Sequence, residues 1–180
     1  MDGRVGSGPV STIRPVRFEF VQRLQAPLPV VEAAFVDPEF LEQLAASPRL
    51  GRVELLDSTD DGEHVHQRIR YSFAGELSGA VKAVVDPARL TWVEDSTLDR
   101  RSHVTAFTIL PDNYARLLDA SGSIRLEPDD HAGTLRRVEG NLSVHVPFAG
   151  RKVEAAIVSG LQEHAEVEET VLNQWVRDRR

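Results

Sequence analysis

The sequence contains no cysteine, a single methionine and only 6% aromatic residues. The absence of cysteine excludes disulfide bonds, thiolate nucleophiles, and zinc or iron–sulfur centres held by cysteine. The sequence also has no apolar run long enough to cross a membrane, and its first residues lack the apolar core of a secretory signal. We therefore expect a cytoplasmic protein with no integral membrane association.

Basic residues are outnumbered by acidic ones, 21 to 28, which gives a net charge of -7. Nucleic-acid binding needs a basic face, so this charge argues against a nucleic-acid partner. The arginine pairs at 100–101 and 136–137 are interpreted as solvated surface. The sequence carries no motif of a nucleotide-binding loop, a serine hydrolase or a zinc protease, and we expect no cofactor.

The length of 180 residues suits one domain with a sizeable core. Residues 1–15 are rich in glycine, serine and proline and predict a flexible tail. The remaining pattern, residues 16–177, predicts a single domain.

Alternation of apolar and polar residues predicts a series of strands joined mostly by short turns. Two short helices are expected after the first strand, at 30–36 and 38–46, with Asp37 capping the second. Residues 80–85 fit either a short helix or a strand, and an amphipathic pattern predicts a long helix at 151–176. This order indicates an α+β fold in which a curved antiparallel sheet wraps around the final helix. The predicted strands are 17–24, 52–57, 63–73, 90–94, 103–110, 116–127 and 134–146.

The final helix carries two ionisable residues, His164 and Glu168, in the middle of its apolar stripe. Burial of such groups without partners or water is costly, so their position indicates a cavity between helix and sheet. The rest of the stripe is formed by Val153, Ile157, Gly160, Leu161, Val171, Leu172 and Trp175.

Strand alternation turns further polar residues toward the same interior, namely Gln67, Tyr71 and Glu94. For Glu94, an edge position or partial exposure is the alternative. Small residues (Ala120, Gly122 and Gly140) fall at the middle of inward faces, where they either leave room for a ligand or, for the glycines, mark bulges. The inward face of 103–110 stays undecided, because both of its faces are mixed.

Two pairs of residues suggest chemistry. His164 and Glu168 lie one helical turn apart, which fits an acid–base pair, a ligand contact or a satisfied polar pair in a core. His64 and His66 share one strand face and could ligate zinc with nearby aspartates. Arginines on that face would repel a cation, so we expect solvent there and no metal site.

Four segments resemble the START-like superfamily, also called SRPBCC or helix-grip proteins, which includes lipid-transfer proteins, polyketide cyclases and birch-pollen-allergen relatives. Within it, the chain is similar to a bacterial family catalogued as a domain of unknown function. The resemblance covers residues 17–176 and implies a helix-grip fold with a deep apolar cavity for lipids, sterols or other hydrophobic molecules. It implies no particular activity, and residues 75–85 do not align with a standard strand. The matching segments are 89–94, 133–140, 146–154 and 168–175.

The sequence thus predicts a protein that binds or carries a small hydrophobic ligand, such as a lipid or a sterol-like or polyketide-like compound. One alternative is a cofactor-independent cyclase, aromatase or hydratase in which His164 is the base and Glu168 orients it. Another is an interaction module like the co-chaperone relatives of the superfamily. The candidate ligand contacts are Gln67, Ile69, Tyr71, Trp92, Glu94, Ala120, Gly122, Ile124, Gly140, Leu142, Ile157, Leu161, His164 and Glu168.

Overall fold

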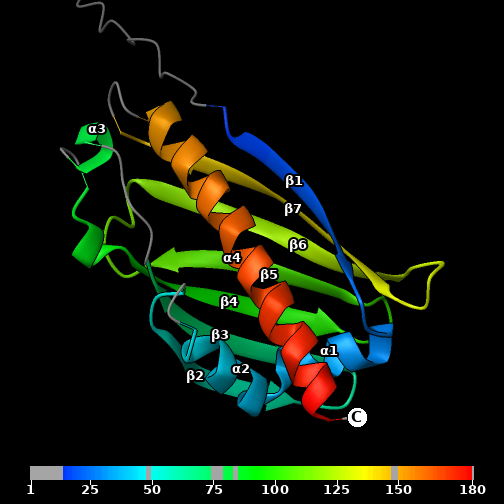
Figure 1. Ribbon diagram of the computed structural model, residues 1–180. Coiled ribbons are helices and arrows are strands. Elements are labelled where there is room, and N and C mark those ends of the chain that lie inside the picture. Colours follow the sequence, from blue (N-terminus) through cyan, green and yellow to red (C-terminus); the bar gives the residue numbers. More distant parts are fainter. Residues whose placement is uncertain (1–13, 48–49, 74–78, 83–84, 147–149, 180) are drawn as a thin grey trace, which may run out of the picture.

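Seven antiparallel strands form one curved sheet, and the long helix α4 (Gly150–Asp178) runs diagonally across its concave face (Figure 1). The strand order is β1-β7-β6-β5-β4-β3-β2, so β1 and β2 are the edges and every other strand pairs on both sides. This arrangement confirms the predicted α+β helix-grip fold. The strands are β1 (Val16–Leu24), β2 (Val53–Asp60), β3 (His64–Ser72), β4 (Thr91–Asp99), β5 (Val104–Pro111), β6 (Leu118–Pro128) and β7 (Thr134–Val144).

The computed structural model describes residues 14–47, 50–73, 79–82, 85–146 and 150–179. Most of the predicted tail, part of the 75–85 segment and residues 147–149 lie outside the described residues. The division into a tail and a single domain therefore stays a prediction. Within the described residues, no helix is both long and apolar enough to cross a membrane.

The strand at 90–94 was predicted too short, because β4 continues to Asp99. Residues 95–99 are mostly polar and carry a weak strand signal by themselves. They are held by pairing: Ser96 lies opposite Gln67, and Leu98 lies opposite Val65, on β3. Residues Gly79–Lys82 form the short helix α3, and Pro87–Arg89 form a single 3₁₀ turn, η1.

The two short helices after β1 are present as α1 (Leu28–Val36) and α2 (Pro38–Ala45). Each has a proline in its first turn, where the missing N–H costs no hydrogen bond. The carboxylate of Asp37 accepts a hydrogen bond of 2.8 Å from the backbone N–H of Glu39, which confirms the predicted cap.

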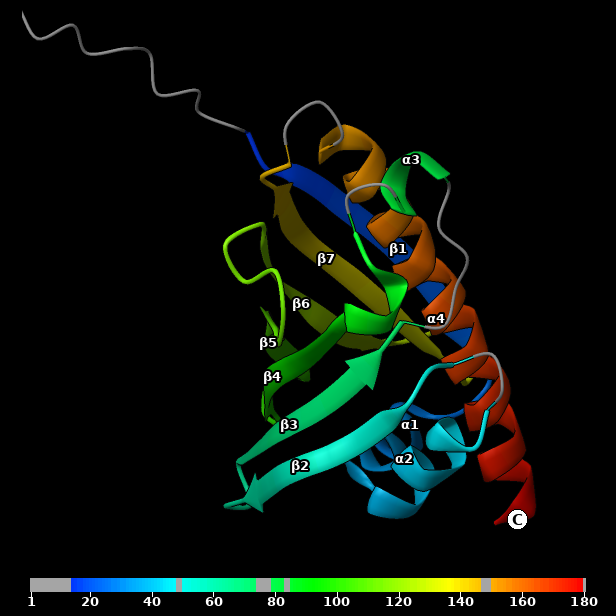
Figure 2. The ribbon, with the colours of Figure 1, turned by 90° about the vertical axis from the view of Figure 1, so that its left-hand side faces the viewer.

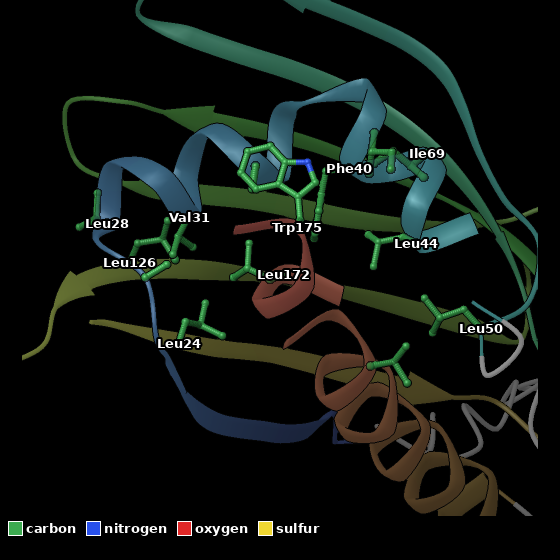
Figure 3. Close-up of a cluster of buried hydrophobic side chains, with 14 of the residues drawn as sticks. Leu24, Leu28, Val31, Phe40, Leu44, Leu50, Ile69, Leu126, Leu172 and Trp175 are labelled. Atoms are coloured by element: carbon green, nitrogen blue, oxygen red, sulfur yellow. The ribbon is translucent and has the colours of Figure 1, made fainter. Parts of the chain in front are cut away.

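Helices α1 and α2 fill one end of the space between sheet and helix, where the C-terminus lies (Figure 2). There the C-terminal half of α4 inserts Leu172 and Trp175 among apolar side chains of α1 and α2 (Figure 3). The Trp175 and Phe40 rings meet edge to face, with centroids 6.0 Å apart. This half of the interior is a solid core.

Gly122 and Gly140 lie directly opposite each other on β6 and β7. The pairing continues through both glycines without a register shift, so the bulge interpretation is wrong; the irregularity in the sheet is between Leu55 and Asp57 in β2. The glycines do not leave empty space either. A Cβ on Gly140 would lie 2.5 Å from the Phe18 ring, and one on Gly122 would lie 2.7 Å from the Phe107 ring.

We expect Gly122→Ala to destabilise the protein by about 1–3 kcal/mol or more, because overpacked cores lose stability by that amount. Its Cβ would also lie 2.2 Å from the backbone carbonyl oxygen of Glu139, which cannot move aside cheaply. Urea denaturation measures the effect. Gly160→Ala is the control, because a Cβ at Gly160 meets nothing within 4 Å, and helix propensity favours alanine by roughly 0.5–1 kcal/mol. Equal losses in both variants would contradict the packing argument.

Candidate functional site

A cavity of about 300 Å³ lies between the sheet and the N-terminal half of α4. It occupies the part of the interior that α1 and α2 leave unfilled. This volume is at the small end of the range for small-molecule sites. The wall is mainly apolar and includes Phe18, Phe20, Phe73, Trp92, Phe107, Ile109, Tyr114, Ile124, Leu142, Ile157 and Leu161.

Most of the residues predicted as ligand contacts line this cavity. Four do not. Ile69 packs in the core formed with α1 and α2, and Gln67 lies two residues farther from the cavity along β3. Gly122 and Gly140 are covered by aromatic rings, as described above. The predicted residues that do line it are Tyr71, Trp92, Glu94, Ala120, Ile124, Leu142, Ile157, Leu161, His164 and Glu168.

The structure shows which face of the segment 103–110, now β5, points inward. Thr105, Phe107 and Ile109 lie opposite inward residues of β4, and Phe107 and Ile109 reach the cavity. Neither face of 103–110 is uniformly apolar, so alternation alone could not choose between them. The choice depends on which residues of β4 they pair with.

The two histidines considered for zinc, His64 and His66, lie on the outer face of β3. There the Nε2 atom of His66 is 2.9 Å from a carboxylate oxygen of Asp95, and His64 is 3.7 Å from Asp61. Arg68 joins the same Asp95 carboxylate at 3.4 Å. These contacts with aspartates lie on the outer surface.

A network of charged side chains lies at the boundary between cavity and solid core. One oxygen of Glu168 is 2.6 Å from Arg136 Nη1, and the other is 3.4 Å from His164 Nε2. The same Arg136 nitrogen donates to the side-chain oxygen of Gln22 at 2.8 Å, and the Gln22 amide donates to the carbonyl of Ala165 at 2.7 Å. The network therefore joins β1, β7 and α4.

Sequence reasoning missed Arg136. Its interpretation as solvated surface is wrong, because only 7% of the residue is exposed. The signal was present: Arg136 lies two residues before the apolar Val138 in the predicted strand 134–146, so alternation turns both side chains to the same face. Arg137, by contrast, lies on the outer face and pairs with Glu19 at 3.1 Å.

Arg136 determines the protonation of the network. Burial alone would raise the pKa of Glu168, but Arg136 and His164 outweigh burial and lower this pKa to about 2. Burial alone would lower the pKa of His164, but the neighbouring Glu168 carboxylate raises it above its usual value. Glu168 is therefore ionised at neutral pH, and His164 holds its proton to higher pH than an ordinary histidine.

Glu94 behaves differently, although it lines the same cavity. It lies between Ile69 and Ile109 on the neighbouring strands, and among the described residues it has no hydrogen-bond or ion-pair partner. Burial first, and the Glu168 charge second, raise the pKa of Glu94 to about 7, although His164 and Arg136 oppose the shift. The cavity thus contains a carboxyl group that exchanges its proton near neutral pH.

Tyr71 completes the polar end of the cavity. Its ring stacks on Trp92 with centroids 6.0 Å apart and meets the His164 ring edge to face at 5.3 Å. Burial, Glu94 and Glu168 raise the pKa of Tyr71 well above its usual value, so its hydroxyl stays neutral. Chemically, the site combines an apolar chamber with the carboxyl group of Glu94 and an imidazole held by an ionised network.

We expect Arg136→Met to lower the free energy of unfolding by about 3–5 kcal/mol, because it leaves the Glu168 charge buried without its partner. Chemical denaturation of the Arg136→Met, Glu168→Leu double variant provides the comparison. Replacing both members by apolar side chains removes the unpaired charge, so the double variant should be more stable than Arg136→Met. A double variant at least as unstable as the single one would contradict the ion-pair argument.

The pKa of Glu94 predicts a pH-dependent difference in stability. Between its ordinary pKa near 4.5 and its folded value of about 7, the folded protein holds more protons than the unfolded chain. The stabilisation from protonated Glu94 is complete below pH 4.5 and is lost as the pH rises through 7. Glu94→Gln has no such loss, so relative to wild type it should gain up to ~3 kcal/mol between pH 4.5 and 8.

Urea titrations of wild type and Glu94→Gln at pH 5 and pH 8 measure this difference. The exposed Glu163→Gln on α4 is the matched control, and its difference from wild type should be the same at both pH values. A pH-independent difference for Glu94→Gln would show that Glu94 titrates like an exposed carboxyl.

Comparison with solved structures supports the architecture. ZhuI aromatase/cyclase from Streptomyces sp. R1128 matches with 19% identity and a TM-score of 0.63 over 92% of this chain and 96% of that one. Norcoclaurine synthase from Thalictrum flavum matches with 15% identity and a TM-score of 0.61 over 96% and 95%. TTHA0849 from Thermus thermophilus matches with 13% identity and a TM-score of 0.62 over 88% and 98%. At these identities the likeness establishes the fold alone.

No curated protein matches the sequence significantly. The family model described as protein of unknown function (DUF2505) matches residues 19–176, and the chain belongs to this family.

Proposed function

We propose that this protein binds a small, mainly hydrophobic molecule in the cavity between the sheet and the N-terminal half of α4. The observation that carries the proposal is the cavity itself, an apolar chamber of about 300 Å³ with ionisable groups gathered at one end. Protein interiors are normally packed to crystal-like density, and an unfilled apolar space costs stability. A ligand that fills the chamber would recover those contacts.

The proposed contacts follow from the lining. Trp92, Ile124, Leu142, Ile157 and Leu161 would surround the apolar part of the ligand, with Ala120 and Tyr71 beside them. Glu94, His164 and Glu168 would lie near its polar end. Gln67, Ile69, Gly122 and Gly140 drop out of the proposed set because they do not reach the cavity.

Related folds give this proposal a precedent. Norcoclaurine synthase, which shares the fold, has been solved in complex with dopamine and hydroxybenzaldehyde, two small aromatic compounds. That complex describes the other protein, and it supports the idea that a cavity of this architecture accepts small ring compounds.

The enzymatic alternative uses the same cavity but needs different roles from those expected from sequence. Because Glu168 and Arg136 hold an ionised pair beside it, His164 would donate a proton, and Glu94 would be the candidate base. General acid–base groups do not by themselves specify a reacting bond, so we propose binding and not catalysis. A solid interior would favour the interaction-module alternative, whereas the cavity supports ligand binding instead.

Filling the cavity from α4 tests the proposal. Gly160 lines the cavity, and a Cβ there would meet nothing within 4 Å, so Gly160→Phe should place its ring in the chamber. N-phenyl-1-naphthylamine, an uncharged apolar dye, should bind wild type with increased fluorescence. We expect Gly160→Phe to weaken dye binding at least tenfold, since the ring takes up space that the dye needs.

Gly160→Ala is the matched control: it keeps the helix change without filling the chamber, and it should bind the dye like wild type. Thermal unfolding verifies that both variants are folded. Absence of dye binding by wild type, or equal binding by a folded Gly160→Phe, would contradict the proposed site.

A further inference from the structure

The hydrogen-bonding groups at the polar end of the cavity are not equally available. Both oxygens of Glu168 are engaged, one by Arg136 and one by His164. The Gln22 side chain is engaged through both its oxygen and its nitrogen. Both oxygens of Glu168 and both polar atoms of the Gln22 side chain are therefore engaged before any ligand enters.

Glu94 is the exception among the lining carboxyls that the structure describes. Glu163 is exposed and accepts a hydrogen bond from Ser159, whereas Glu94 is partly buried between two isoleucines and has no described partner. The Glu94 oxygens are not among the fully enclosed polar atoms that lack a partner. They therefore border the cavity, where a ligand atom could reach them.

The following inference rests on the proposed function. We propose that the ligand is a compact, uncharged ring compound bearing a hydroxyl group, and that this hydroxyl donates a hydrogen bond to Glu94. A carboxyl oxygen accepts a hydrogen bond whether the group is ionised or protonated. A hydroxyl therefore suits Glu94 in both of its states.

The charges around Glu94 favour an uncharged ligand over an ionised one. Arg136 of β7 and His164 of α4 would repel a cation, whereas Glu168 of α4 and the ionised form of Glu94 itself would repel an anion. The remaining titratable neighbour, Tyr71 of β3, is neutral. Burying a new charge without a dedicated partner is costly, and the existing partners are already paired.

The shape of the chamber favours a ring over a long chain. The stacked pair of Tyr71 and Trp92 lies beside Glu94 on the inward face, and Phe107 lines the cavity from β5. Flat aromatic walls pack well against a flat ligand. At about 300 Å³, the chamber also limits the ligand to a compact body.

Calorimetric titration with two matched probes tests the proposal. 2-Naphthol carries the hydroxyl, and 2-methoxynaphthalene keeps the oxygen and the rings but cannot donate. At pH 7.5, where 2-naphthol is neutral, we expect wild type to bind 2-naphthol roughly ten times more tightly or more, the advantage of a hydrogen bond to a carboxylate.

Variants test whether Glu94 is the source of the preference for 2-naphthol over 2-methoxynaphthalene. In Glu94→Leu the two affinities should become nearly equal, while 2-methoxynaphthalene still binds. Glu94→Gln should keep part of the preference, because its amide oxygen still accepts. Glu163→Leu is the matched control on the cavity rim and should keep the whole preference.

The outcomes separate the two proposals. Equal affinities in wild type, or a preference that persists in Glu94→Leu, would overturn the role of Glu94 and leave the binding function standing. If the protein binds N-phenyl-1-naphthylamine but neither naphthalene compound, the proposed role of Glu94 is also overturned. Failure of the dye and both compounds together would overturn the binding function itself.

Discussion

The buried ion pair between Arg136 and Glu168 is the interaction on which the organisation of the interior depends. It joins the middle of α4 to β7, and through Gln22 it reaches β1. Buried pairs of this kind add little net stability compared with apolar residues, but a pair left incomplete is costly. The pair therefore restricts how α4 can lie on the sheet, since a rotation of the helix would leave both charges buried without partners.

The same pair divides the interior into two halves with different properties. On one side, α1, α2 and the end of α4 form a solid core around Phe40, Leu172 and Trp175 (Figure 3). The guanidinium carbon of Arg136 lies 4.7 Å from the centre of the Phe35 ring of α1, so the guanidinium group covers this side of the core. On the other side, α4, the sheet and loop residues such as Val85 and Tyr114 line a space that stays hollow. The solid half thus supplies the packing that stabilises the fold, and the hollow half leaves space for a ligand.

The charge network also sets the chemistry of the hollow half. Because Arg136 keeps Glu168 ionised, Glu168 raises the pKa of His164 and, across the cavity, also that of Glu94. The His164 imidazole can therefore donate a proton near neutral pH, and the Glu94 carboxylate can accept one.

Much of this could be predicted from the sequence by itself, because periodicity is a local property. The alternation of β3 placed Tyr71 inward, and the helical stripe placed His164 and Glu168 on the face that meets the sheet. The order of the elements determined the α+β class. Only the tertiary structure decided which of these positions face a cavity: Ile69 and Tyr71 share one strand face, yet Tyr71 reaches the cavity and Ile69 does not. Alternation alone turns Arg136 inward, but only the tertiary structure placed Glu168 beside it. A buried charge is stable only with such a partner, and no local pattern records a pairing between distant residues.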